Sequence, residues 1–554
     1  MDTGVEAIRT QLRRAVDECS ARGLAAAAKW AAEQLCSLPA ASTSSPSPAA
    51  EERSDQAAQQ DQAERDRVAL AKCLFDLREF ERAAFALEEC SGPRATFLRL
   101  YSRYLNRERQ AQANGNGSGA DEGQADQTEH GLLAIRDELL DVSEPDSFCL
   151  YLLGLVQEQL GQREAARESC LRSVRAFEFN WSCWQLLATL LDTRQPSDSL
   201  GTELPATWMR HAFLAQVLVE QFTATSEADF QAHVRTLELL FTEQNQFLLG
   251  LRAVRHYNVR EYSEARQAFR ALQQLDPFRL DLSDTYSNIL YVMEDRAQLS
   301  MLAHRCAALD RFRPETCVVI GNYYGLRREH EKAVAYFQRA LQLDSKYLAA
   351  WTLMGHEFIE MKNTHAAADA YQHALRVDQR DYRAWHGLGN TYEMLNMYHY
   401  ATEYHMRAAS LRPYDSRMWF SLGTCYEKVD RRPQAIESYR RALLGSAEME
   451  AMAITRLAHI HEQEGSRKRA AYYYQLLVEH AIKNGGVSDP LGISGGQPQD
   501  ELARACIFLA AFETDRSNPQ AAQKYLAQVV DAAGISPQKV EEAKAMMRAV
   551  TSTA

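Results

Sequence analysis

The sequence has 554 residues, too many for one compact core of ordinary size, so it must fold as several domains or as an elongated array. Its formal net charge of −12 argues against general binding to a nucleic-acid backbone and mildly favours basic peptide partners. No apolar run approaches the roughly 18–20 residues of a membrane span, and the first residues lack the apolar core of a signal peptide. We therefore expect a protein of the nucleus and cytoplasm, without nucleic acid or membrane among its partners.

The eleven cysteines are scattered and form no CxxC pair. In a protein of the nucleus or cytosol, this pattern is typical of buried, reduced thiols. We therefore expect neither a disulfide framework nor a zinc site built from paired cysteines.

The N-terminal part begins with residues 1–37, which read as two helices with alanine-rich packing around Trp30. Residues 38–62 are rich in Ser, Pro, Ala and Gln and are predicted to be a disordered linker. This linker contains Ser45 and Ser47, each followed by proline. A proline-directed kinase could phosphorylate both serines, although the sequence slightly favours an unmodified linker.

Residues 63–245 are predicted to form an array of helix pairs, with units starting near Glu64, at Ser147 and at Trp181. An acidic insert, residues 108–130, interrupts this array and is predicted to be disordered because it is polar and low in complexity. The last fifty residues of the segment read as helical but do not share the spacing of the units. They therefore divide an N-terminal array from a C-terminal one.

A repeated motif marks residues 246–483. WTLMGHEF (351–358) recurs as WHGLGNTY (385–392) and as WFSLGTCY (419–426), each 34 residues after the last. Counting each unit from its first residue, Trp falls at position 4, Gly at 8, an aromatic residue at 11, and Ala at 20 and 27. The same frame fits units that start at Gln246, Pro314, Leu348, Tyr382 and Ser416. It fits a unit from Leu280 only in part, and a unit from Ala451 after a one-residue slip near Gly445.

This period and pattern resemble the tetratricopeptide repeat (TPR), a pair of antiparallel helices, A and B. Small residues at positions 8, 20 and 27 let the two helices approach closely, and large residues fill the space around them. One pair cannot bury both of its apolar faces, so neighbouring pairs stack. We predict an all-α fold, a TPR superhelical solenoid with disordered insertions. Residues 484–500 are predicted to be a loop, and residues 501–554 a last set of TPR-like helices.

No arrangement of residues points to catalysis. The glycines of GLGNTY lie within a predicted helix and lack the Lys-Ser/Thr of a phosphate-binding loop. His459 and His461 stand two residues apart on a helix, so their rings face different directions, and no cysteine stands near them. We expect no enzyme activity, no cofactor and no metal site.

Peptide binding is the function that the repeats favour. In stacks of this type, helix A residues at positions 2, 5, 9, 12 and 13 line the concave face. Asparagine amides can pair with an extended peptide backbone, and glutamates can hold arginine. Taken singly, each such residue could equally belong to a solvated helix face. The predicted peptide-binding residues are Asn322, His356, Glu357, Asn390, Glu393 and Glu427.

A narrower resemblance is carried by RPETC and VIGNYY (313–324), AWTLMGHE (350–357), EMKNT (360–364), RDYRAW (380–385) and LRPYDSRMW (411–419). These segments resemble the family of the eighth subunit of the anaphase-promoting complex. The resemblance is close over about residues 313–419 and looser in the flanks. The low-complexity segments depart from the family pattern.

The resemblance implies a scaffold subunit of a multi-subunit cullin–RING ubiquitin ligase that acts in cell division. Such subunits homodimerise through their N-terminal repeats, here residues 63–245, and stack with other TPR subunits. Their C-terminal groove receives the basic C-box motif of a coactivator. By position in the best-matching motifs, this role falls on Asn322 and Glu357, with Asn390 and Glu393 as neighbours.

A co-chaperone adaptor that binds acidic C-terminal peptides is the alternative. Such adaptors clamp a carboxylate with lysine or arginine, beginning at position 5. Here position 5 holds Val318, Thr352, His386 and Phe420. The clamp is incomplete, so the sequence favours the ligase scaffold.

Overall fold

The computed structural model describes most of the chain as helix, and it contains no strand in the residues it describes. Apart from a few single or paired positions, those residues are 2–24, 71–115, 122–191, 204–221, 226–444, 447–483, 498–531 and 536–553. The predicted linker 38–62, with Ser45 and Ser47, lies outside them, as do residues 484–497 of the predicted loop. No helix in the described ranges is both long and apolar enough to cross a membrane.

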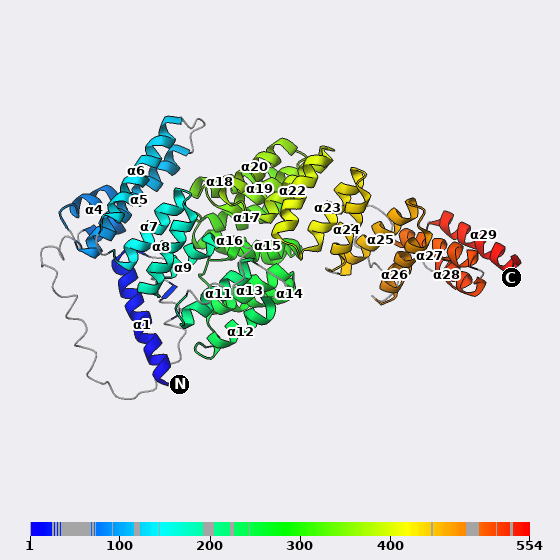
Figure 1. The fold of residues 1–554 in the computed structure, drawn as a ribbon, viewed down its shortest axis with the longest axis horizontal. Helices are drawn as coiled ribbons and strands as arrows, with labels where there is room; N and C mark the ends of the chain where they lie inside the picture. The colour runs from blue at the N-terminus through cyan, green and yellow to red at the C-terminus, as the bar shows by residue number, and fades with distance from the viewer. Residues whose placement is uncertain are drawn as a thin grey trace. The chain divides into compact units, whose positions relative to one another are not determined.

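The helices of the first half follow one another largely as antiparallel neighbours (Figure 1). They are α1 (Asp2–Ala21), α4 (Phe80–Ala86), α5 (Pro93–Gly115), α6 (Glu122–Leu140), α7 (Ser147–Gln159), α8 (Arg163–Ala176), α9 (Trp181–Leu190), α11 (Trp208–Gln221), α12 (Ser226–Glu238), α13 (Gln246–Val259), α14 (Tyr262–Leu275), α15 (Ser283–Val292), α16 (Arg296–Leu309) and α17 (Pro314–Leu326).

The second half continues as helix pairs, in which odd-numbered helices up to α27 are the A helices (Figure 1). They are α18 (His330–Leu343), α19 (Leu348–Glu360), α20 (Thr364–Val377), α21 (Tyr382–Met394), α22 (Tyr398–Leu411), α23 (Ser416–Lys428), α24 (Arg432–Ala442), α25 (Ala447–Gln463), α26 (Arg467–Lys483), α27 (Pro498–Asp515), α28 (Pro519–Asp531) and α29 (Pro537–Thr553). The all-α TPR prediction is confirmed.

Two expectations about the N-terminal part differ from the structure. The insert 108–130 is helical up to Gly115 and again from Glu122, so disorder was the wrong prediction for most of it. Its sequence is polar, but it is rich in Ala, Gln and Glu, which favour helix even without apolar residues to bury.

The compact units also divide at a different point from the predicted boundary at residue 245. One unit comprises residues 1–326 with 342–345, and the other comprises 327–341 with 346–554. Leu248 of α13 packs in the same buried cluster as Trp184, and Leu251 packs with Phe230 of α12. The stacking therefore continues through residue 245 because α13 is needed to cover the helices before it.

The recurrence of tryptophan at position 4 of several repeats has a specific structural cause. Trp184, Trp385 and Trp419 each stand at position 4, and each indole N–H donates to the backbone carbonyl six residues earlier, at 2.6–2.8 Å. This bond ties the start of helix A to the turn that precedes it. Trp385 and Trp419 then pack against buried residues of both their own and the preceding repeat.

The glycine at position 8 makes room for the residue at position 24. A Cβ atom on Gly355 would lie 2.5 Å from the Tyr371 ring, and one on Gly423 would lie 2.7 Å from the Tyr439 ring. Each tyrosine is fully buried. The predicted role of these glycines in packing helix A against helix B is confirmed.

The turn between helices A and B is left-handed at position 15 in repeat after repeat. The residues with positive φ there include Arg260 (72°), Lys362 (59°) and Asp430 (59°). After Lys362, the amide of Asn363 donates to the carbonyl of Phe358 at 2.9 Å, which closes the end of α19 in the way that αL residues usually end helices.

Candidate peptide-binding groove

All six predicted peptide-binding residues lie on A helices, but they differ in exposure. Asn322 lies on α17, His356 and Glu357 on α19, Asn390 and Glu393 on α21, and Glu427 on α23. Asn322 belongs to the first compact unit, and the other five belong to the second.

Asn322 is buried, with 3% of its surface exposed. Its amide donates to Ser287 Oγ at 2.7 Å and to Asn288 Oδ1 at 2.8 Å, both on α15. These bonds join the A helices of two successive repeats. In this arrangement the side-chain amide serves the packing of the unit.

Glu357 is also buried, with 5% of its surface exposed. Its Oε2 lies 2.6 Å from Nδ1 of His330 on α18. One of the two carboxylate oxygens is therefore already hydrogen-bonded. Burial raises the pKa of Glu357, and the hydrogen bond from His330 opposes this shift. The carboxylate that the motif match singled out is thus bonded to helix B of the preceding repeat.

The other predicted residues reach the surface. His356 is exposed on one side, and its Nδ1 lies 2.7 Å from the hydroxyl of Tyr371. The protein packed around the ring and the nearby Arg383 lower its pKa to about 4, so the ring is neutral at pH 7. Half-buried Glu427 accepts from the Tyr439 hydroxyl at 2.8 Å and lies 3.8 Å from Arg456.

The amide of half-buried Asn390 lies 3.4 Å from Nδ1 of His386 on the same helix. His386 Nε2 lies 3.2 Å from Ser421 Oγ on α23. Polar side chains therefore connect the A helices α21 and α23 within the second unit. They offer an incoming peptide both donors and acceptors.

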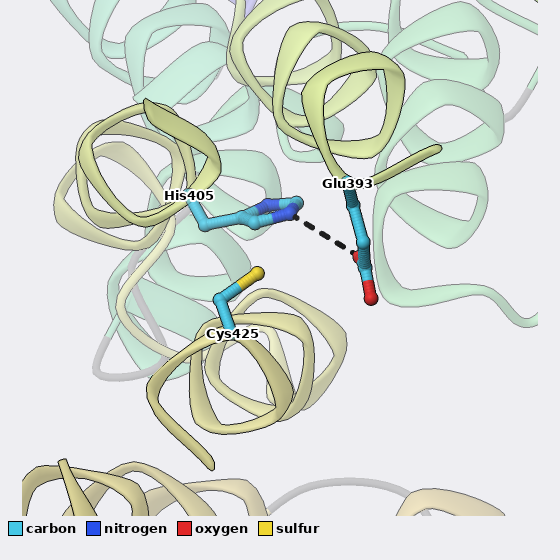
Figure 2. Close-up of side chains that lie close together, drawn as sticks. All are labelled: Glu393, His405 and Cys425. Carbon is cyan, nitrogen blue, oxygen red and sulfur yellow. Dashed lines mark ion pairs between the residues drawn. The ribbon is translucent and has the colours of Figure 1, made fainter. Parts of the chain in front are cut away.

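Glu393 stands in a group that the sequence analysis did not anticipate. It lies close to His405 of α22 and Cys425 of α23, and Figure 2 shows the three side chains pointing toward one another. Burial raises the pKa of Glu393, and Lys428 opposes the shift. Burial and His386 lower the pKa of His405 to about 3, whereas burial and Glu393 raise that of Cys425 to about 12.

One signal in the sequence could have indicated this group. Position 24 of the neighbouring repeats holds Tyr371 and Tyr439, but the repeat that starts at Tyr382 has His405 there. Within the described ranges, the group of Glu393, His405 and Cys425 is the one arrangement with the spacing of metal ligands.

His459 and His461 have separate partners, as their spacing predicts. His459 Nε2 lies 3.2 Å from Glu501, and His461 Nδ1 lies 3.0 Å from Glu464. The two rings therefore do not share a ligand position.

The positions of a carboxylate clamp do not suit an acidic peptide. Val318 is fully buried, and Thr352 is buried with its hydroxyl bonded to Asp381 at 2.9 Å. Neither can meet a peptide carboxylate. These two positions therefore cannot take part in a carboxylate clamp.

Comparison with known proteins decides the family. A family model described as anaphase-promoting complex subunit 8 / Cdc23 matches residues 7–253, and a tetratricopeptide-repeat model matches residues 314–347 and 348–381. Anaphase-promoting complex subunit 8 of Arabidopsis thaliana is 40% identical over 579 residues, covering 98% of this chain and 96% of the relative. The chain belongs to the subunit 8 family.

More distant members of the subunit 8 family share the match. Anaphase-promoting complex subunit CDC23 of Saccharomyces cerevisiae is 31% identical, covering 66% of this chain and 71% of the relative. Among solved structures, the Cut9–Hcn1 hetero-tetramer of the anaphase-promoting complex has a TM-score of 0.52 at 14% identity, covering 90% of this chain and 98% of that chain. At this identity the structural likeness supports the TPR solenoid fold alone.

Proposed function

We propose that this protein is a non-enzymatic scaffold subunit of the anaphase-promoting complex, a cullin–RING ubiquitin ligase that acts in the cell cycle. It homodimerises, stacks with other TPR subunits and works in the nucleus and cytoplasm. Its membership of the subunit 8 family over 98% of the chain supports this proposal most strongly. Catalysis then belongs to other subunits, which agrees with the lack of any catalytic arrangement in the sequence.

The C-terminal array binds the basic C-box peptide of a coactivator. The carboxylates at position 12, Glu393 and Glu427, are half-buried on A helices of successive repeats. A half-buried carboxylate is partly desolvated, so its charge-assisted bond to an arginine is stronger than one in open water. Asn390 fixes the peptide backbone beside them.

Asn322 and Glu357 have a different part in this proposal. Both side chains are buried, and their hydrogen bonds to α15 and to His330 tie them to neighbouring helices. We assign them to holding their repeats in the binding-competent shape, and we assign first contact with the peptide to Glu427 and Asn390.

Titrating a fluorescent C-box peptide against the full chain tests this assignment by anisotropy. Glu427→Gln should weaken binding by about tenfold or more, because a charge-assisted hydrogen bond contributes about 1.5–3 kcal/mol. Asn390→Ala should weaken it by a smaller factor. Glu437→Gln is the matched control, since Glu437 is exposed on α24 and pairs with Arg441 of its own helix. Binding to the wild type should also weaken with salt.

The result for Glu357→Gln separates the two assignments. Positioning through His330 predicts that this variant loses less affinity than Glu427→Gln and also lowers the melting temperature. A loss larger than that of Glu427→Gln without any change in melting would instead make Glu357 the arginine ligand. Equal affinity of the peptide for the wild type, Glu427→Gln and Asn390→Ala would contradict the proposed groove, and preference for an acidic peptide would favour the co-chaperone alternative.

A further inference from the structure

Three consecutive helices of the second unit bring together an oxygen, a nitrogen and a sulfur ligand. Glu393 of α21, His405 of α22 and Cys425 of α23 each offer one ligand atom, and these atoms all lie within 4.8 Å of one another (Figure 2). The side chains of His405 and Cys425 are fully buried, whereas that of Glu393 is 31% exposed. The histidine and the cysteine are thus shielded from solvent, and the group contacts solvent only through the carboxylate of Glu393.

The repeat frame explains why His405 lacks a partner. In two later repeats the tyrosine at position 24 donates its hydroxyl to the glutamate at position 12: Tyr439 to Glu427 and Tyr474 to Glu462, both at 2.8 Å. His405 and Glu393 occupy the same two positions. Because imidazole is shorter than a phenol, Nε2 of His405 stops 4.0 Å from the carboxylate.

Neither ring nitrogen of His405 has a hydrogen-bond partner among the described residues. A buried polar group without a partner is unfavourable, and native structures rarely keep one without a reason. Gly389 holds the ring in place from the other side, since a Cβ atom there would lie 2.4 Å from the imidazole. The ring therefore cannot easily turn away to find another partner.

We propose that Glu393, His405 and Cys425 form a binding site for a divalent transition-metal cation of the zinc class. Thiolate, imidazole and carboxylate are the ligands that zinc takes in proteins, whereas magnesium and calcium prefer oxygen ligands alone. Metal–ligand bonds of about 2.0–2.3 Å place tetrahedral ligand atoms about 3.3–3.8 Å apart. The three ligand atoms thus need to approach one another by up to about 1.5 Å through side-chain adjustments.

Metal binding would exchange water ligands for protein ligands and release one proton to solvent. The cation replaces part of its water shell with the three protein ligands, and the thiol of Cys425 releases its proton to solvent because only the thiolate binds. Water on the side of the exposed carboxylate completes the fourth position. The ion would link the A helices of two successive repeats through the B helix between them.

Cobalt titration of the metal-stripped full chain tests the proposal. The wild type should take up one equivalent of Co²⁺ with a thiolate-to-cobalt charge-transfer band in the near ultraviolet, and Zn²⁺ should abolish the band. Zn²⁺ should also raise the melting temperature, because a ligand that binds only the folded state stabilises it.

His405→Tyr is the decisive variant, because it restores the tyrosine–glutamate pair of the neighbouring repeats and should fold at least as stably as the metal-free wild type. It should show no cobalt band and no thermal shift with Zn²⁺. Cys425→Ser should also lose the charge-transfer band, whereas Cys506→Ser, which changes another buried thiol, should keep it. Absence of the band in the wild type, or its persistence in His405→Tyr, would overturn the proposal and leave a bridging water as the partner of His405.

Discussion

At the scale of single residues, close contact between helices A and B depends on what stands at position 8. The Gly389 Cα faces the buried His405 ring so closely that one added methyl group would overlap it. Gly389→Ala should therefore destabilise the chain by roughly 1–3 kcal/mol, the usual cost of overpacking. Thermal or urea unfolding measures the change.

Gly250→Ala provides the matched control for that experiment. Its added methyl group would lie 3.4 Å from Leu282, an ordinary contact, and alanine favours helix over glycine by about 0.5–1 kcal/mol. This control should be neutral or stabilising. If both variants unfold at the same temperature or urea concentration as the wild type, the close contact between Gly389 and the His405 ring does not affect the stability of the chain.

The positions and surroundings of the residues at the candidate site could be predicted only in part. The repeat frame placed Glu393 and Glu427 correctly on A helices, because position 12 depends only on the period. It could not show that Asn322 and Glu357 are buried, since their partners Ser287, Asn288 and His330 come from other helices. It also gave no sign of Cys425 beside His405, which depends on three helices packing together.

At the scale of helices, the turn between A and B stores backbone strain. Lys362 is exposed and adopts a φ of 59°, a conformation that costs a residue with a side chain roughly 1–2 kcal/mol. Lys362→Gly should therefore stabilise the chain by up to about 1 kcal/mol, since the flexibility of glycine in the unfolded chain offsets part of the gain.

Gln372→Gly is the comparison for this helix-scale prediction, because Gln372 is exposed within helix α20. There glycine should cost about 0.5–1 kcal/mol. Urea unfolding of both variants measures the difference. Destabilisation of the same size in both would show that position 15 carries no strain.

A pair of histidines makes the α11–α12 hairpin sensitive to acid. Nδ1 of His211 and Nδ1 of His233 lie 2.9 Å apart, so one ring must donate and the other accept. Burial lowers the pKa of both, aided for His211 by Arg210 and for His233 by His211. Their folded-state pKa values thus lie below the unfolded value of about 6.5.

The sign of the pH dependence follows from these shifts. The stability that the pair contributes is present above about pH 6.5 and is lost as the pH falls toward the folded pKa values, because the unfolded chain then binds more protons. Melting temperatures at pH 7.5 and 5.5 should fall less in His233→Gln than in the wild type. An equal fall in both proteins would contradict a role for the pair.

Helix boundaries show how far the period determines the fold. Units predicted to start at Ser147, Trp181, Gln246, Pro314, Leu348, Tyr382 and Ser416 have A helices that begin at those residues. Prediction was poorer where the sequence shows no clear repeat spacing. Helix α25 begins four residues before the predicted Ala451, and the polar insert 108–130 forms the end of α5 and the start of α6. The left-handed turns at Arg260 and Lys362 could not be read from residue type, since Arg and Lys rarely adopt them.

At the scale of the whole molecule, the proposal places dimerisation in residues 63–245. Light scattering of the full chain should give twice the mass of one chain. Hydrogen exchange measured above and below the dissociation concentration should show protection on dimerisation in peptides from residues 63–245. Protection confined to residues 246–554 would place the dimer contact in the C-terminal array.

Membership of a ligase complex is the central claim, and native purification tests it most directly. The full chain, tagged and expressed at its natural level in cells of its source organism, should be purified without crosslinking and its partners identified by mass spectrometry. The account predicts a cullin, a RING subunit and several other TPR subunits in constant proportion, all eluting with the tagged chain as one large complex. Recovery of the chain alone, or with chaperones that carry acidic C-terminal peptides, would contradict it.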